Sequence, residues 1–123
     1  MEFDALSNRV IGCAIEAHRE LGPGLLESTY EKCLAYELST HGMTVATQVE
    51  LPVRYKGVLL DCGYRIDVLV DDQIIIEVKS VDKVIPIHEA QLLTYLKLAK
   101  KRIGLLMNFN TVRLKDGIRR FVM

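Results

Sequence analysis

The sequence predicts an α/β protein in which helices pack on a mixed β-sheet. Two segments near the N-terminus carry apolar residues at helical spacing, and the centre of the chain alternates with a period of two. A further helical segment separates the last strands from the others, so the predicted order of elements is α-α-β-β-β-β-α-β-β-β. A chain of 123 residues is long enough for one hydrophobic core, and we expect residues 1–123 to form a single domain.

Residues 5–21 and 25–41 are the two predicted N-terminal helices, because their apolar residues recur at helical spacing. The segment Leu-Gly-Pro-Gly at 21–24 lies between them. Glycine suits the position after a helix and proline cannot continue one, so this segment ends the first helix. Gly42 ends the second helix in the same way.

The alternating part of the chain follows the second helix. Residues 43–55 are expected to form one or two strands, with an edge or a bend at Pro52. Two further strands are expected near residues 58–70 and 73–80. These strands would form the centre of the sheet.

The last third of the chain returns to a helical pattern before its final strands. A third helix is expected at about 87–100, followed by a strand at 102–107. The chain then ends in a predicted hairpin, TVRLKDGIRRFVM, in which Asp116 and Gly117 form the turn. An edge strand in this hairpin could pair with a second copy of the chain.

The composition is typical of a soluble globular protein, with a net charge of zero. No apolar run approaches the roughly 20 residues that span a bilayer, and the N-terminus lacks the apolar region of a secretion signal. We therefore expect a cytoplasmic protein that does not bind membranes. Residues 1–96 hold 8 Lys and Arg against 15 Asp and Glu, whereas residues 97–123 hold 8 against one. The basic end indicates either a polyanion-binding surface or a solvated helix end and hairpin.

Three charged residues interrupt the apolar segment RIDVLVDDQIIIEVKS at 65–80. Asp67 lies within the first predicted strand, and Glu77 and Lys79 lie within the second. Because side chains alternate along a strand, Glu77 and Lys79 share one face of the sheet. Whether Asp67 joins them depends on the turn between the strands.

A two-residue turn would put Asp67 opposite Ile76, on the wrong face of the sheet. An odd turn such as Asp71 to Gln73, or a bulge, would put Asp67 opposite Glu77. We predict the odd turn, since it alone gathers the three charges.

The gathered charges require a physical reason. Two neighbouring carboxylates repel, and Mg²⁺ would offset this repulsion because it binds one or two carboxylates together with water. A protonated lysine beside the metal can orient a water or stabilise charge that develops on a phosphate. The alternative is purely structural: Asp67 and Lys79 form an ion pair, and Glu77 is exposed at a sheet edge.

Two other segments carry polar residues beside apolar stripes. In HEAQLLTYLKL, Gln91 and Tyr95 lie four residues apart on one side of the third helix. In the second helix, Glu27 lies next to the apolar stripe that contains Tyr30. These positions favour side chains that reach a site at the edge of the core.

The segment GLLESTY at 24–30 matches the pattern GxxExxY, and the chain resembles the GxxExxY protein family. Asp67, then Glu-Val-Lys at 77–79, then Gln91 with Tyr95 resemble the motifs of PD-(D/E)xK nucleases in the RecB-like form with a trailing QxxxY. The resemblance covers nearly the whole chain. Each motif alone is weak, but their order on the expected elements is specific.

The resemblance implies a restriction-endonuclease-like core, with a central mixed sheet flanked by helices. It implies that Asp67 and Glu77 bind Mg²⁺ or Mn²⁺, with the Val78 carbonyl as a further ligand. Lys79 would be the catalytic lysine, and Glu27 would match the helix carboxylate that many such nucleases direct at the metal.

The same resemblance implies that Gln91 and Tyr95 hold the scissile strand or the lysine. His18 is either an upstream metal ligand, as in some RecB-like nucleases, or a packing or capping residue, which we favour. For His88 and Tyr30 we also favour structural roles.

The expected function is metal-dependent hydrolysis of DNA phosphodiester bonds, with Lys79 positioning the attacking water. The alternative is a non-catalytic module of nuclease fold for nucleic-acid binding or partner assembly. The complete motif set favours catalysis, while the short chain with few aromatics favours a homodimer or a protein partner that completes the binding surface. Candidates for phosphate contacts are the basic residues Lys100, Lys101, Arg102, Arg113, Lys115, Arg119 and Arg120.

Overall fold

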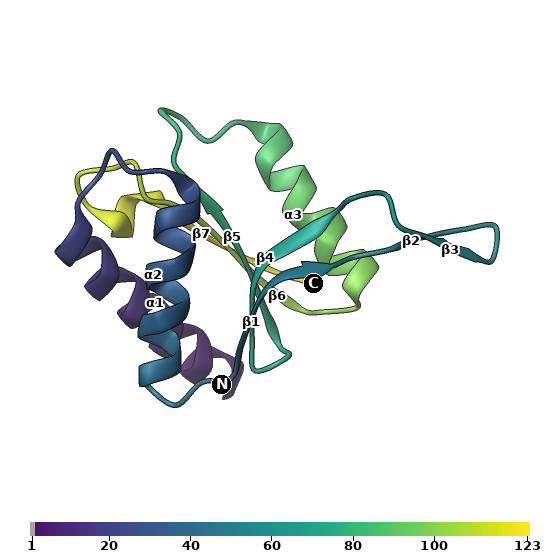
Figure 1. The fold of residues 1–123 in the computed structure, drawn as a ribbon, viewed down its shortest axis with the longest axis horizontal. Helices are drawn as coiled ribbons and strands as arrows, with labels where there is room; N and C mark the ends of the chain where they lie inside the picture. The colour runs from purple at the N-terminus through teal and green to yellow at the C-terminus, as the bar shows by residue number, and fades with distance from the viewer. Residues whose placement is uncertain (1) are drawn as a thin grey trace.

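A computed structural model describes residues 2–123 of the chain, with side chains from residue 5 onward (Figure 1). It confirms the predicted fold class: a mixed five-stranded sheet flanked by helices, as in restriction-endonuclease-like proteins. The helices are α1 (Glu2–Leu21), α2 (Glu27–Thr40) and α3 (Pro86–Ala99). The strands are β1 (Val45–Glu50), β2 (Val53–Tyr55), β3 (Val58–Leu60), β4 (Arg65–Val70), β5 (Ile74–Lys79), β6 (Ile103–Asn108) and β7 (Ile118–Val122).

The main sheet has the strand order β1-β4-β5-β6-β7. Strands β5 and β6 are parallel, because α3 carries the chain back across the sheet between them, and the other neighbours are antiparallel. Strands β2 and β3 form a separate two-stranded arm that projects from the body of the molecule (Figure 1). The sheet edges are therefore β1 and β7.

Helices α1 and α2 cover one face of the sheet. Their apolar residues at helical spacing, such as Tyr30, Leu34 and Leu38 of α2, are fully buried against strand residues such as Val68 and Ile76. No helix in the described part of the chain is long and apolar enough to cross a membrane.

Helix α3 covers the opposite face. Leu92 and Leu96 pack there with Ile75 and other residues of the sheet. A Cβ atom at Gly104 of β6 would lie only 3.0 Å from the Cδ1 atoms of both leucines. The glycine therefore lets α3 lie close to the middle of the sheet.

The predicted odd turn between β4 and β5 is confirmed. Val70 pairs with Ile74, which leaves the three residues 71–73 for the turn. Asp71 and Asp72 both have left-handed backbones, with φ of 50° and 54°. Aspartate tolerates this conformation better than most residues, because its short side chain can bond locally.

Two expectations about the strands are wrong. Residues 58–70 form two strands, β3 and β4, so five strands precede α3. The final segment is not a self-contained hairpin: residues 114–117 form a 3₁₀ helix, and β7 pairs with β6. A Cβ at Gly117 would lie 2.3 Å from the Asn108 carbonyl oxygen, so this glycine is needed for close packing of two backbones.

Candidate functional site

The sheet opens into a fork between β4 and β5. Their backbone pairing ends at Val68 and Ile76, beyond which β4 stays paired with β1 and β5 with β6. The two strands diverge there (Figure 1). In the fork, the Val78 N–H donates a hydrogen bond of 2.8 Å to Oδ2 of Asp67. A carboxylate thus replaces the backbone acceptor at the point where the strands separate.

Glu77 lies opposite Asp67 when the register of β4 and β5 is continued by one residue. Its side chain is only 4% exposed, and Oε1 has no hydrogen-bond partner among the described residues. Burial, followed by the charge and hydrogen bond of Asp67, raises the pKa of Glu77 to about 9, while the charge of Lys79 lowers that pKa. The three charges that the turn was expected to gather therefore act on one another.

The arrangement expected for a purely structural role is not the one observed. It required Glu77 to be exposed at a sheet edge, but Glu77 is buried in the central strand of the sheet. It also required an ion pair between Asp67 and Lys79, and the described side chains form none between these two residues. Asp67 instead bonds to the Val78 N–H and to Gln48.

Gln91 and Tyr95 of α3 lie beside this cluster. The Gln91 Nε2 atom donates to the Tyr95 hydroxyl at 3.0 Å. The pKa of Tyr95 is raised, first by burial and further by the charges of Glu77 and Asp67. The charges of both carboxylates therefore act on the Tyr95 hydroxyl, and α3 places Gln91 and Tyr95 at the fork.

Glu27 at the start of α2 reaches the end of β5. Its Oε2 accepts a hydrogen bond of 3.3 Å from the N–H of Ser80, the residue after Lys79. The Ser80 hydroxyl in turn donates to the Leu25 carbonyl at 2.6 Å. The segment around Glu27 is thus tied to the end of β5, and Glu27 makes its hydrogen bond with backbone rather than with Asp67 or Glu77.

Two further residues at the fork were not expected from the sequence, Glu31 and Gln48. The Gln48 Nε2 atom donates to Glu31 Oε1 at 2.6 Å and to Asp67 Oδ1 at 3.4 Å. Burial raises the pKa of Glu31, and the charge of Asp67 raises it further. Glu31 could have been found, because it lies one helical turn after Glu27.

Gln48 carried no such signal in the sequence. It lies within β1 between the pairs Thr47–Val68 and Val49–Ile66, yet its φ is 51°. A left-handed backbone is unfavourable for a residue with a Cβ, so the surrounding structure must hold it. The left-handed backbone thus occurs at Gln48, the residue whose side-chain amide bonds to both Glu31 and Asp67.

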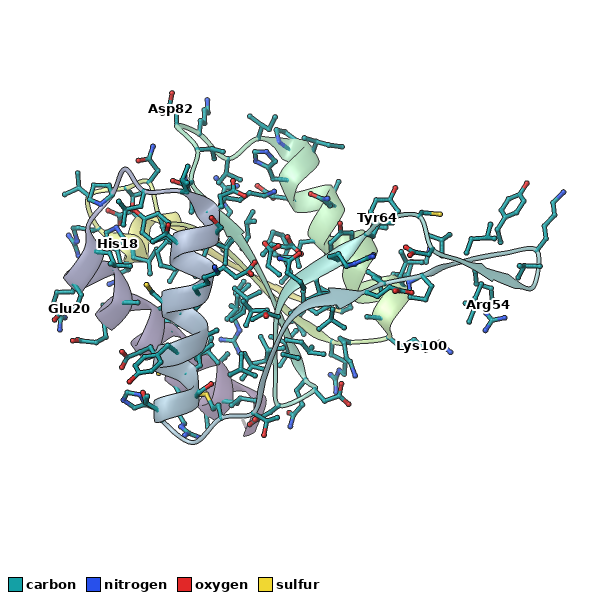
Figure 2. The ribbon with its side chains drawn as sticks, in the orientation of Figure 1. His18, Glu20, Arg54, Tyr64, Asp82 and Lys100 are labelled. Atoms are coloured by element: carbon teal, nitrogen blue, oxygen red, sulfur yellow. The ribbon has the colours of Figure 1, made fainter. Side chains whose placement is uncertain are left out.

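The structure favours packing roles for the two histidines. The Nε2 atom of His18 lies 3.0 Å from the carbonyl oxygens of both Phe109 and Thr111, so this nitrogen carries a proton and donates. It holds the loop after β6 on the α1 side of the sheet (Figure 2). His88 Nδ1 accepts the Ile85 N–H at 3.2 Å and caps the start of α3.

Tyr30 is also structural. Its hydroxyl donates to the Gly22 carbonyl at 2.5 Å and accepts the Leu25 N–H at 3.1 Å. Its ring stacks on Phe109 with the centroids 4.6 Å apart. The tyrosine of GLLESTY therefore fixes the loop that precedes Glu27.

The donor set at the fork fits a hard divalent cation. Within residues 5–123, whose side chains are described, no three His, Cys, Asp or Glu side chains converge to hold a metal by themselves. Mg²⁺ does not need three, since it commonly takes one or two carboxylates and completes its shell with water. Asp67 and Glu77 supply two, and the unpartnered Oε1 of Glu77 is the kind of buried oxygen that a cation would satisfy.

The basic residues near the C-terminus do not form one surface. Residues 100–102 follow α3 at the end of the sheet where β5 begins, away from Lys79, and Lys101 pairs with Asp72 at 3.0 Å. Arg119 pairs with Glu89 of α3. Arg113 and Lys115, in contrast, are exposed after β6, at the end of the sheet where β5 also ends.

Comparison with known proteins gave one match. The family model of the PD-(D/E)XK nuclease superfamily matches residues 4–121. Searches of curated proteins and of solved structures returned no match.

Proposed function

Because this match covers nearly all of its length, the chain belongs to the PD-(D/E)XK nuclease superfamily, and we propose that it is a metal-dependent nuclease that hydrolyses DNA. The observation that carries the proposal is the buried, unpartnered carboxylate oxygen of Glu77 opposite Asp67 and beside Lys79. A site with no metal partner would leave this oxygen as a standing cost to stability. The GLLESTY segment supports placement in the GxxExxY group.

Asp67 and Glu77 are the residues proposed to hold Mg²⁺ or Mn²⁺, with the Val78 carbonyl and Glu27 as further candidates. When bound, the metal supplies a water of lowered pKa and positive charge for the phosphate oxygens. The Val78 N–H donates to Oδ2 of Asp67, and the Gln48 amide donates to Oδ1. Gln48 and Glu31 would keep Asp67 in one orientation.

Lys79 has the role of the catalytic lysine. Alternation along β5 puts it on the same face as Glu77, and its charge already acts on that carboxylate. An ammonium at this position can orient the attacking water and stabilise the charge that develops on the phosphate. Gln91 and Tyr95, joined by their hydrogen bond, would hold the scissile strand or the lysine beside it.

The proposal is tested by calorimetry with Mg²⁺ and Mn²⁺, and by cleavage of single- and double-stranded DNA on the same samples. We expect Asp67→Ala and Glu77→Ala to lose both metal binding and cleavage. Lys79→Ala should keep metal binding and lose cleavage, because it removes no ligand. The matched control is Glu20→Ala, which removes an exposed carboxylate of α1.

Other outcomes would change the proposal in defined ways. If the wild-type protein binds neither metal, with or without DNA, the charges are structural and the catalytic proposal fails. Metal binding without cleavage of any DNA would support the non-catalytic alternative, a nuclease fold kept for nucleic-acid binding or for assembly with a partner.

A further inference from the structure

A groove of about 540 Å³ lies beside the site, between α3 and the base of the β2–β3 arm. We call it the α3 groove and define it by Val53, Tyr64, Ile87, Gln91 and Tyr95, which line it. Its volume is within the range of about 300 to 1,000 Å³ in which proteins bind small organic groups.

The α3 groove is continuous with the fork. Gln91 and Tyr95 line the groove and are also the pair that lies next to the carboxylates. The Tyr64 ring meets the Tyr95 ring edge-on, with centroids 5.9 Å apart and an interplanar angle of 61°. A group that fills the groove would therefore touch residues that border the proposed cleavage centre.

The walls of the groove are aromatic and aliphatic, and they are open to solvent. Tyr64 is 42% exposed and Ile87 is 65% exposed. The Gln91 side chain adds hydrogen-bonding capacity at the end nearest the fork. An open tyrosine ring with an aliphatic wall and a polar end matches a nucleobase, which is flat and has polar edges.

The β2–β3 arm, whose base lines the groove, carries positive charge. Arg65 follows Tyr64 directly, donates to its carbonyl at 2.8 Å and pairs with Asp61 at 3.3 Å. Arg54 projects from the arm (Figure 2). Lys56, in the turn of the arm, lies over the exposed ring of Tyr55 with its Nζ 5.5 Å from the ring centroid. Cations interleaved with exposed tyrosines are the combination by which proteins hold a single nucleic-acid strand.

We propose that the α3 groove binds an unpaired nucleobase next to the scissile phosphate, and that the protein therefore acts on single-stranded or frayed nucleic acid. This rests on the proposed nuclease function. In a duplex each base is stacked and paired, so it cannot enter a groove that lies to one side of the backbone. Arg54 and Lys56 of the arm contact the neighbouring phosphates.

The test uses a single-stranded oligodeoxynucleotide with one 2-aminopurine, whose fluorescence is quenched on stacking, and the same strand as a duplex. Binding is measured in Ca²⁺, with cleavage checked on gels of the same samples. Four proteins are compared: wild type, Tyr64→Ala, Tyr64→Phe and the control Tyr36→Ala. Tyr36 is 73% exposed on α2, on the other face of the sheet.

We expect Tyr64→Ala to weaken single-strand binding about tenfold and to abolish the quenching. Tyr64→Phe keeps the ring and should behave as wild type, as should Tyr36→Ala. Duplex binding should not change in any variant. The groove proposal is overturned if the wild type does not bind the single strand. It is also overturned if Tyr64→Ala binds the single strand as wild type does, or if this variant loses affinity for the single strand and the duplex equally.

The result also separates this inference from the proposed function. If the wild type cleaves DNA in Mg²⁺ but binding and quenching do not depend on Tyr64, the nuclease proposal stands and the groove proposal alone is wrong. If quenching depends on Tyr64 but no DNA is cleaved, the groove binds bases and catalysis is the part that fails.

Discussion

The two faces of β5 differ in what they are built for. Ile74, Ile76 and Val78 point to α1 and α2, where each is 1% exposed or less. Ile75, Glu77 and Lys79 point to the α3 face, where Ile75 packs against α3 and one oxygen of the buried Glu77 carboxyl stays without a partner. Glu77 is thus the residue of β5 whose position costs stability, while the isoleucines and Val78 stabilise the fold. Substitutions at Ile76 and at Glu77 should therefore change stability with opposite signs.

The largest effect is expected on the apolar face. Ile76→Ala should lower the free energy of unfolding by about 2 to 5 kcal/mol, because it leaves a cavity in a fully buried cluster. Urea unfolding measures this loss, with Ile76→Val, expected at about 1 kcal/mol, as the matched control. Metal affinity of the folded fraction should stay the same. A variant that lost metal binding while still folded would contradict the division between the faces.

On the other face, Glu77→Gln should stabilise the metal-free protein at pH 7, by up to roughly 3 kcal/mol. The folded-state pKa of about 9 lies above the usual 4.5, so the folded state binds the extra proton. Wild-type stability relative to Glu77→Gln should then be highest below pH 4.5 and fall as the pH rises toward 9. Unfolding of both proteins across this range in a chelator measures the difference. A constant difference across the range would show that the pKa of Glu77 is not raised.

The same pKa predicts a proton linked to metal binding. Because a carboxylate ligand must be ionised, Mg²⁺ affinity should rise about tenfold per pH unit between pH 5 and 9. Calorimetry at pH 7 in buffers of different ionisation enthalpy should show release of about one proton per metal. Release of none would mean that Glu77 is already ionised or is not a ligand.

The smallest effect is expected at Gln48, which joins the fork to α2. Gln48→Gly should be more stable than Gln48→Ala by about 1 kcal/mol, because glycine adopts a positive φ without strain. Both should reduce metal affinity several-fold, since Asp67 loses the amide that orients it. Thermal unfolding and calorimetry on this pair separate the backbone effect from the side-chain effect. Equal stability of the two variants would argue against strain at this residue.

The sequence predicted the parts of the fold and site that depend on local pattern. The alternation of β5 and the argument that charges must meet gave the correct turn between β4 and β5. The sequence could not predict the kink at Gln48, because nothing in the local sequence indicates a glutamine with a left-handed backbone. It also misassigned Gly117, whose small size serves a contact with Asn108 rather than a hairpin turn. Long-range contacts decide both cases.

Glu31 and the fork show a further limit of the same kind. Helical spacing from Glu27 could have predicted Glu31. Nothing in the sequence indicated that Gln48 of β1 would connect Glu31 to Asp67. The divergence of β4 from β5 likewise arises because β4 stays paired with β1 while β5 stays paired with β6. A pattern along one strand contains no information about that choice.

Gly104 makes the distance between the two halves of the site depend on an absent side chain. Leu92 and Leu96 already lie 3.0 Å from where its Cβ would be, so a methyl group there would force these side chains, or α3 with them, to give by a few tenths of an ångström. Gln91 and Tyr95 are neighbours of these leucines and would move with the helix, while Glu77 would not. The close approach of α3 to the sheet, and with it the placement of Gln91 and Tyr95, therefore depends on a residue without a side chain in β6.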